Sequence, residues 1–239
     1  MINIDLLTTW LSGQCSSNAP LSKGQTFNMD LFADLLTDPT INHLPQDGTV
    51  NYFGEIFSPI QADDYFSKLL QETSWQYDQA LIRGKLITTN RRVAWYGNQS
   101  YPYTYSGTTK QALPWTETLL ALKSLIEEKT GAKYNSCLVN LYDDGNTGMA
   151  WHSDNEGLLV EDAAIASLSF GAERRFLFRH KTTLQTIEFK LAHGSLLVMK
   201  DQTQRYWLHS LPKMARVKEA RINLTFRVIK EKGFTTPPK

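Results

Sequence analysis

The stretch MAWHSDNEG, residues 149–157, places an imidazole and a carboxylate two positions apart, at His152 and Asp154. On an extended strand, residues i and i+2 point to the same side, so both groups can face one ion. A non-haem iron(II) site of the facial-triad type uses two imidazoles and one carboxylate and leaves other coordination positions open. With 5 histidines and 24 acidic residues in 239 positions, one such pair can arise by chance. The assignment therefore depends on a second imidazole from elsewhere in the chain.

Three histidines compete for that position. His209 lies in RYWLHSLP, a run typical of a strand. His193 precedes a glycine in an expected turn, and His180 lies among basic residues that we expect to face solvent or a phosphate. Strand placement favours His209, and the other two remain open at this point.

The segment RINLTFR, residues 221–227, could bind an anion. By strand periodicity Arg221, Asn223, Thr225 and Arg227 share one face, and the apolar residues between them point to the other. A buried row of this kind is costly unless an anion fills it, and a dicarboxylate suits two guanidinium groups. The alternative is an amphipathic edge strand whose arginines are solvated.

The rest of the chain predicts helices first and strands afterwards. Ser58 and Gln61 form an expected capping box for a helix from Pro59 to about Leu70, and a second helix runs over about 114–129, with Gly131 behind it. After Gly131, short runs rich in branched and aromatic residues are separated by turns. Those runs are YNSCLVNLY, AAIASLSFG, RRFLFRHK, LQTIEFKLA, GSLLVMK, RYWLHSL and INLTFRVI. The pattern predicts an α+β, mainly β fold, a closed sandwich or barrel with helices packed on one side.

Composition and charge argue against a membrane protein and bear on the compartment and partner of the protein. No apolar run is long enough to span a membrane, and two cysteines outside any CxxC motif fit a reducing cytoplasm. The formal net charge of +1 conceals a split, because residues 1–80 carry a net −8 and residues 81–239 a net +9. The later part thus suits a polyanionic partner. Residues 1–47, rich in turn formers, are expected to be an N-terminal extension, followed by one domain over 48–239.

Several of these motifs together resemble the AlkB family of iron(II)- and 2-oxoglutarate-dependent nucleic-acid dealkylases, in particular its branch acting on DNA. The resemblance extends from about Ile87 to Ile229 and rests on NLYDDGNTGMAWHSDNE, IASLSFGAERRFLFRHK, LAHGSLLVMK, HSLP and RINLTFR. It implies a double-stranded β-helix, or jelly roll, and the co-substrates 2-oxoglutarate and O2 beside Fe(II).

The resemblance also implies roles for individual residues. The iron ligands would be His152, Asp154 and His209. The 2-oxoglutarate carboxylates would bind Arg221 and Arg227, helped by Asn140, Tyr142 and Asn223. Tyr103, Tyr105, Ser106 and Glu156 would lie near the damaged nucleotide. Apart from the resemblance, the basic segment near the lid makes Arg91 and Arg92 candidates for phosphate contacts, and the alternative is a solvated hairpin. Asn155 departs from the acid often found there in relatives, and residues 1–47 show no match.

The function expected from this resemblance is oxidative demethylation of N-alkylated bases, such as 1-methyladenine and 3-methylcytosine in DNA. The protein would act as a monomer on alkylated DNA, without a membrane, in the cytoplasm or, in a eukaryote, the nucleus. The alternatives are an RNA demethylase, a 2-oxoglutarate-dependent hydroxylase of a small molecule or protein, and a nucleic-acid-binding jelly roll with a vestigial site.

Overall fold

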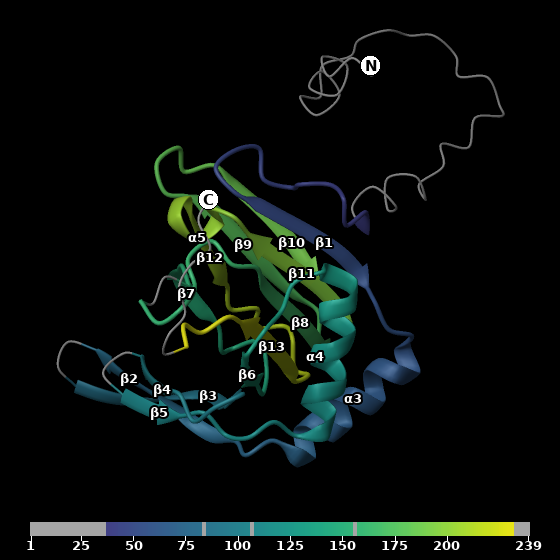
Figure 1. Cartoon of the computed structure of the whole chain (residues 1–239), viewed down its shortest axis with the longest axis vertical. Coiled ribbons are helices and arrows are strands. Elements are labelled where there is room, and N and C mark those ends of the chain that lie inside the picture. The colour runs from purple at the N-terminus through teal and green to yellow at the C-terminus, as the bar shows by residue number, and fades with distance from the viewer. Residues whose placement is uncertain (1–36, 83–84, 106–107, 155–156, 232–239) are drawn as a thin grey trace, which may run out of the picture. The chain divides into compact units, whose positions relative to one another are not determined.

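Two antiparallel sheets make up the body of the protein in this computed structural model (Figure 1). The structure describes residues 37–82, 85–105, 108–154 and 157–231, with the backbone alone at 80–82, 102–105 and 108–110. In the described residues, no helix is both long enough and apolar enough to cross a membrane.

The larger sheet has seven strands in the order β1-β11-β8-β13-β6-β3-β2. Their bounds are β1 Thr49–Glu55, β2 Gln76–Ile82, β3 Lys85–Gly97, β6 Ser136–Tyr142, β8 Ile165–Gly171, β11 Ser195–Lys200 and β13 Arg221–Arg227. Every residue of β13 is buried, because β13 lies between β8 and β6 and both of its faces are covered. This excludes the solvated edge strand as an interpretation of RINLTFR.

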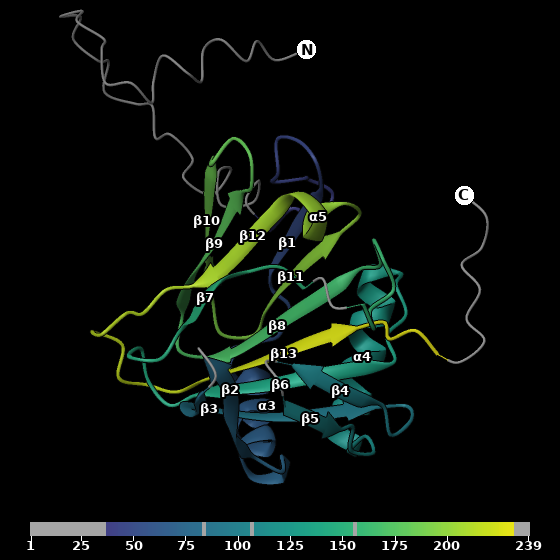
Figure 2. The ribbon, with the colours of Figure 1, turned by 90° about the vertical axis from the view of Figure 1, so that its left-hand side faces the viewer.

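The smaller sheet has four strands in the order β10-β9-β12-β7. Their bounds are β7 Met149–His152, β9 Arg174–His180, β10 Thr186–Leu191 and β12 Trp207–Leu211. Figure 2 shows β9, β10 and β12 in the upper part of the body beside β1 and β11, with β8, β13, β6 and β3 of the larger sheet below them. A separate hairpin of β4 (Pro102–Tyr105) and β5 (Thr108–Gln111) lies beside β2.

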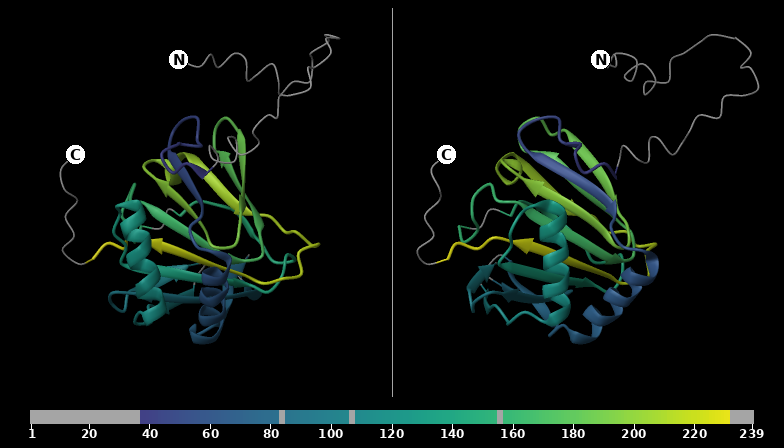
Figure 3. Two further views of the ribbon diagram at one scale, coloured as in Figure 1. Left: turned by 90° about the vertical axis from the view of Figure 1, so that its right-hand side faces the viewer. Right: turned by 45° about the vertical axis from the view of Figure 1, so that its right-hand side comes forward.

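The two long helices cover the outer face of the larger sheet (Figure 3). Helix α3, Pro59–Glu72, begins with the predicted capping box of Ser58 and Gln61. Helix α4, Glu117–Thr130, has Thr116 as its N-cap and ends at Gly131, whose φ of +69° is the left-handed conformation that favours glycine. Helix α5, Thr203–Tyr206, is one turn before β12.

Strand periodicity divides the buried residues into two layers. On β6, β8 and β13 the apolar side chains between the polar ones, such as Val139, Leu168 and Leu224, pack against the helices. The opposite faces meet the smaller sheet, where Phe176, Phe178 and Trp207 form a second core. The polar residues of RINLTFR therefore lie on the inner face, between the sheets.

The predicted fold is confirmed, and the differences lie mainly in short segments. All seven runs predicted after Gly131 contain strands, and both helices extend close to their expected bounds. Two strands had no separate prediction, namely β2 at the edge of the larger sheet and β5 in the separate hairpin. The described part of the predicted extension, residues 37–47, packs on the sheets, with Leu44 buried and the Gln46 carbonyl accepting a hydrogen bond from Trp207 Nε1.

Candidate metal centre and co-substrate pocket

Strand pairing brings two imidazoles together. β7 and β12 are antiparallel neighbours, and His152 lies directly opposite His209 in their register. The two ring centroids are 4.3 Å apart, with the rings inclined at 64°. Residues directly opposite on adjacent strands are the closest neighbours across a sheet, so this register determines the pair.

Asp154 completes the cluster from a loop position. β7 ends at His152, so Ser153 and Asp154 follow the strand and do not continue it, contrary to the expectation that both ligands lie on one strand. Asp154 Oδ1 is 3.8 Å from His152 Nε2 and 3.8 Å from His209 Nε2. The candidate ligand atoms of the three residues all lie within 4.8 Å of one another.

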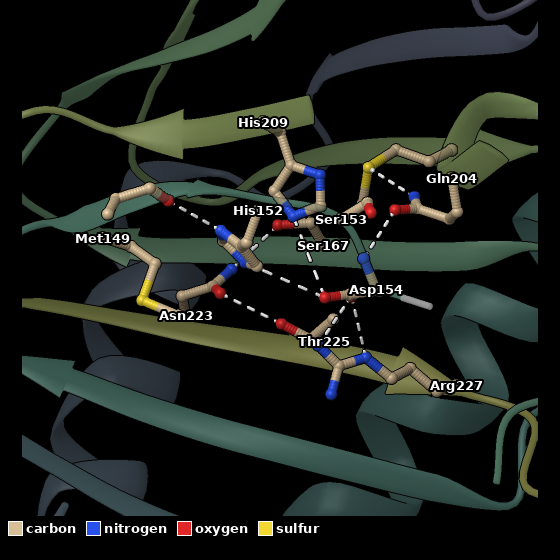
Figure 4. A network of polar contacts seen from close by, with 12 residues as sticks. Met149, His152, Ser153, Asp154, Ser167, Gln204, His209, Asn223, Thr225 and Arg227 are labelled. Carbon is tan, nitrogen blue, oxygen red and sulfur yellow. Dashed lines mark hydrogen bonds and ion pairs between the residues drawn. The ribbon is translucent and has the colours of Figure 1, made fainter. Parts of the chain in front are cut away.

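Arg227 holds the other oxygen of this carboxylate. Its Nε and Nη2 donate to Asp154 Oδ2 at 3.0 and 2.6 Å (Figure 4). Burial alone would raise the pKa of Asp154, but the charge of Arg227 and the two imidazoles lower it below the ordinary value. The carboxylate therefore stays ionised, with Oδ1 turned toward the imidazoles.

The hydrogen bond at His152 and the burial of His209 also suit metal binding. The Ala150 carbonyl lies 2.8 Å from His152 Nδ1, which assigns the proton to Nδ1 and leaves the Nε2 lone pair toward the cluster. Burial, helped by His152, lowers the pKa of His209 to about 3. His209 is thus neutral at physiological pH, as a metal ligand must be.

The competing histidines lie elsewhere. His180 Nε2 contacts Asp47 Oδ2 at 3.1 Å, and His193 Nε2 contacts Asp63 Oδ1 at 3.2 Å. Both Nδ1 atoms accept backbone N–H groups, from Thr183 and Gly171 respectively. His180 itself is buried against Trp207, while the neighbouring basic residues Arg175 and Lys181 are exposed. Two imidazoles and one carboxylate on one side of a point fit iron(II), so the cluster is His152, Asp154 and His209.

One pocket contains this cluster and the predicted anion-binding row. It encloses about 950 Å³ of empty space, its open mouth included. All eight residues predicted for metal and 2-oxoglutarate line it, namely Asn140, Tyr142, His152, Asp154, His209, Arg221, Asn223 and Arg227.

The strand register arranges the polar row in cross-strand pairs. Arg221 lies opposite Tyr142, and Asn223 lies opposite Asn140. Asn223 donates to Ser167 Oγ and to the Leu168 carbonyl, and its own Oδ1 accepts from the Thr225 hydroxyl. Because Arg227 contacts Asp154, it lies at the metal end of the row, and Arg221 lies at the opposite end of β13.

The far end of the pocket has polar atoms without partners. Arg221 is 2% exposed and donates one hydrogen bond, from Nη2 to Ser169 Oγ at 2.9 Å. Within the described residues, its Nε and Asn140 Oδ1 are buried without a hydrogen-bond partner. Burial lowers the pKa of Arg221 to about 10, although Tyr142 opposes the shift, and the group remains a cation. A buried cation of this kind fits one carboxylate of a dicarboxylate, while the other reaches the metal end.

Comparison with known proteins identifies the family. A family model described as the 2OG-Fe(II) oxygenase superfamily matches residues 49–227, which include every strand of both sheets. The mouse protein named DNA oxidative demethylase ALKBH2 is 38% identical over 206 residues, covering 81% of this chain and 86% of that protein. The chain belongs to the AlkB family of 2OG-Fe(II) oxygenases. This AlkB-family enzyme is therefore a dioxygenase that uses Fe(II), 2-oxoglutarate and O2.

Other relatives agree with this assignment to the AlkB family. The bovine protein named Alpha-ketoglutarate-dependent dioxygenase alkB homolog 3 is 40% identical over 179 residues, covering 71% of this chain and 62% of that protein. A solved structure, titled The structure of OsALKBH1, has a TM-score of 0.51 and 17% sequence identity, covering 78% of this chain and 99% of that chain. The likeness to OsALKBH1 supports the fold alone.

The predicted substrate residues have different surroundings. Arg91 is buried in the pocket wall, where its Nη2 is 2.5 Å from Asp78 Oδ2 and its Nη1 is 2.9 Å from Met149 Sδ. It thus lies inside the pocket and not on an outer surface where a phosphate would contact it. Arg92 is partly exposed and pairs with Asp143. Tyr103 and Tyr105 lie on β4, and Ser106 and Glu156 lie outside the described residues.

Two residues of this region were missed by the sequence interpretation. Arg174, at the start of β9, is fully buried and donates to the carbonyls of Asp144, Thr147 and Pro212. Strand parity could have found it, because Arg174 alternates in step with the core residues Phe176 and Phe178. Gln204 accepts the backbone N–H of Asp154 and left no signal in the sequence, since a one-turn helix has no periodicity to detect.

Proposed function

We propose that the protein repairs N-alkylated bases in DNA, such as 1-methyladenine and 3-methylcytosine, by oxidative dealkylation. The observation that carries this proposal is one pocket lined by an Asp and two His at metal-binding distances and by a buried Arg-Asn-Thr-Arg row. The name of the mouse relative, DNA oxidative demethylase ALKBH2, supports the DNA substrate.

Each part of the pocket has a role in this proposal. His152, Asp154 and His209 hold Fe(II), and Arg227 keeps Asp154 ionised and oriented. Arg221, Asn140, Tyr142, Asn223 and Arg227 bind 2-oxoglutarate, the two arginines through its carboxylates. With O2, the bound iron supplies the oxidation of the N-methyl group, which leaves as formaldehyde while 2-oxoglutarate becomes succinate and CO2.

The substrate reaches this pocket by leaving the base stack. A methyl group on the pairing edge is inaccessible inside a duplex, and a lesion that already breaks pairing is less costly to extrude. Tyr103, Tyr105, Ser106 and Glu156 are proposed to contact the extruded nucleotide. Arg92 is proposed to contact the strand, and Arg91, with Asp78, to form the pocket wall near the base.

The protein's partners and location follow from this chemistry. The partner is alkylated DNA, and we propose that a monomer suffices because a single chain supplies the whole lined pocket. A ferrous site and the free, buried Cys137 fit a reducing compartment, the cytoplasm or, in a eukaryote, the nucleus.

The test uses iron-loaded protein and oligonucleotides that each carry one defined lesion. Succinate and restored base are measured together on single- and double-stranded DNA and on the matching RNA, with unmodified DNA as control. We expect one equivalent of each product on DNA with 1-methyladenine or 3-methylcytosine, and none with Asp154→Ala. Succinate without base recovery on any oligonucleotide would instead indicate a hydroxylase of another substrate. Preferential recovery on RNA would make the protein an RNA demethylase.

A further inference from the structure

The side chain of Gln204 bridges the metal cluster to the core. Its Oε1 accepts the backbone N–H of Asp154 at 2.8 Å, and its Nε2 donates to Met199 Sδ at 3.3 Å (Figure 4). A backbone N–H can only donate, so Asp154 requires the carbonyl end of the amide and directs the NH₂ toward Met199. The orientation of the amide is therefore determined by its two neighbours.

Gln204 stands on a helix that is fixed from several sides. It lies in α5, five residues before His209. The Thr203 hydroxyl accepts the N–H of Thr49 on β1 and donates to the Lys200 carbonyl. Lys181 Nζ donates to the carbonyls of Gln204 and Arg205 at 3.0 and 2.8 Å. Because its base is held in this way, the amide of Gln204 is a rigid support.

Asp154 needs such a support because it lies beyond the end of β7. Ladder hydrogen bonds hold His152 and His209, which lie on paired strands. The Asp154 carboxylate is held by Arg227, and its main chain is held by Gln204. The carboxylate is thus fixed from the larger sheet, and the backbone that carries it is fixed from the segment that carries His209.

We propose that Gln204 is a positioning residue for Asp154, which places Oδ1 where it can bind the metal together with the two imidazoles. Groups that orient metal ligands without touching the metal typically contribute 10- to 100-fold to metal affinity. The inference rests on the proposed role of Asp154 as an iron ligand, so the test measures metal binding directly.

The experiment compares Gln204→Met, Gln204→Glu and the control Gln202→Met, in full-length protein without metal. Met has the length of Gln but does not accept the N–H, whereas Glu keeps an acceptor oxygen. Gln202 is exposed, has the same side chain and makes no capping hydrogen bond. Binding of Co²⁺ is followed by its visible absorption spectrum, and the melting temperature of the metal-free protein is measured in parallel.

We expect Gln204→Met to weaken Co²⁺ binding by about 10- to 100-fold and to change its spectrum, with a metal-free melting temperature close to that of the parent. Gln204→Glu should retain most of the affinity, and Gln202→Met all of it. Equal affinity for Gln204→Met and the parent would overturn the inference, as would equal losses for Met and Glu. If the parent itself bound no Co²⁺, the proposed function would fail and not merely this role.

A second measurement does not depend on the variant folding. Hydrogen exchange in the metal-free parent should show the Asp154 amide protected, although it lies outside any strand. Rapid exchange at that amide would contradict the proposed hydrogen bond to Gln204.

Discussion

At the scale of single residues, Asp154 and His209 are in the protonation states that a metal requires. Arg227 and the imidazoles keep Asp154 ionised, while burial keeps His209 neutral. The Ala150 carbonyl selects the tautomer of His152. Asp154 and His209 therefore have no proton to release when a metal binds near neutral pH.

The low pKa of His209 makes the metal-free protein sensitive to mild acid. Its pKa is about 3 in the folded protein against an ordinary 6.5, so the unfolded chain binds a proton that the folded chain does not. Stability therefore falls as pH drops below about 6.5, by up to about 1.4 kcal/mol per pH unit. Denaturant unfolding at about pH 7 and pH 5 should show a smaller loss for His209→Gln than for the parent. Equal losses would show that His209 is not buried in its neutral form.

Arg221 should act on 2-oxoglutarate and not on the metal. A charge-assisted hydrogen bond in a buried site is worth about 1.5–3 kcal/mol, so Arg221→Met should raise the 2-oxoglutarate KM at least about tenfold. Co²⁺ affinity should change little, because Arg221 lies at the end of β13 away from Arg227. Succinate formation against 2-oxoglutarate concentration gives the KM, and an unchanged value would remove Arg221 from the site.

At the scale of elements, the loop before β7 and the loop after β12 meet at a junction, and this junction positions the two strands that carry the imidazoles. Arg174 donates to the carbonyls of Asp144 and Thr147, which precede β7, and to that of Pro212, which follows β12. Gly148 lies so close to the Leu211 carbonyl that a Cβ there would clash with backbone. The pairing of His152 with His209 thus depends on close packing several residues away.

Removing Arg174 should loosen this junction. Arg174→Met leaves three carbonyls without their donor in a buried place, which should cost on the order of 3 kcal/mol of unfolding free energy and weaken Co²⁺ binding. The control is Arg175→Met at the next position, where the guanidinium is exposed and pairs with Glu188. Denaturant titration should show a large loss for residue 174 and little change for residue 175, and similar losses at both would contradict the role of the junction.

At the scale of the whole described body, the site is held by both sheets. His152 and His209 belong to the smaller sheet, and Arg227 reaches Asp154 from the larger one. A metal bound to the cluster would therefore connect the two layers, in addition to the core formed by Phe178 and Leu197.

Metal should accordingly stabilise the folded protein. A ligand that binds only the folded state at 100 times its Kd adds about 2.7 kcal/mol, so the melting temperature should rise with Co²⁺ and return with a chelator. Asp154→Ala should show no such rise. A rise of the same size in Asp154→Ala would place the stabilising metal at another site.

The sequence determined much of this by itself, because the informative signals are local. Alternation in RINLTFR predicted a strand with one polar face, and Ser58 with Gln61 predicted the start of α3. The spacing of His152 and Asp154 indicated a metal, and several motifs together indicated the family.

Only the tertiary structure decided which groups meet, because contacts between distant segments depend on register and burial. Strand order placed His209 opposite His152 and gave His180 and His193 partners elsewhere. Both faces of β13 are covered, so its arginines are buried inside the protein. Arg91 lies in the pocket wall, where it pairs with Asp78. The hydrogen bond between Asp154 and Gln204 joins residues that are 50 positions apart in the sequence, and no local sequence pattern predicts such a contact.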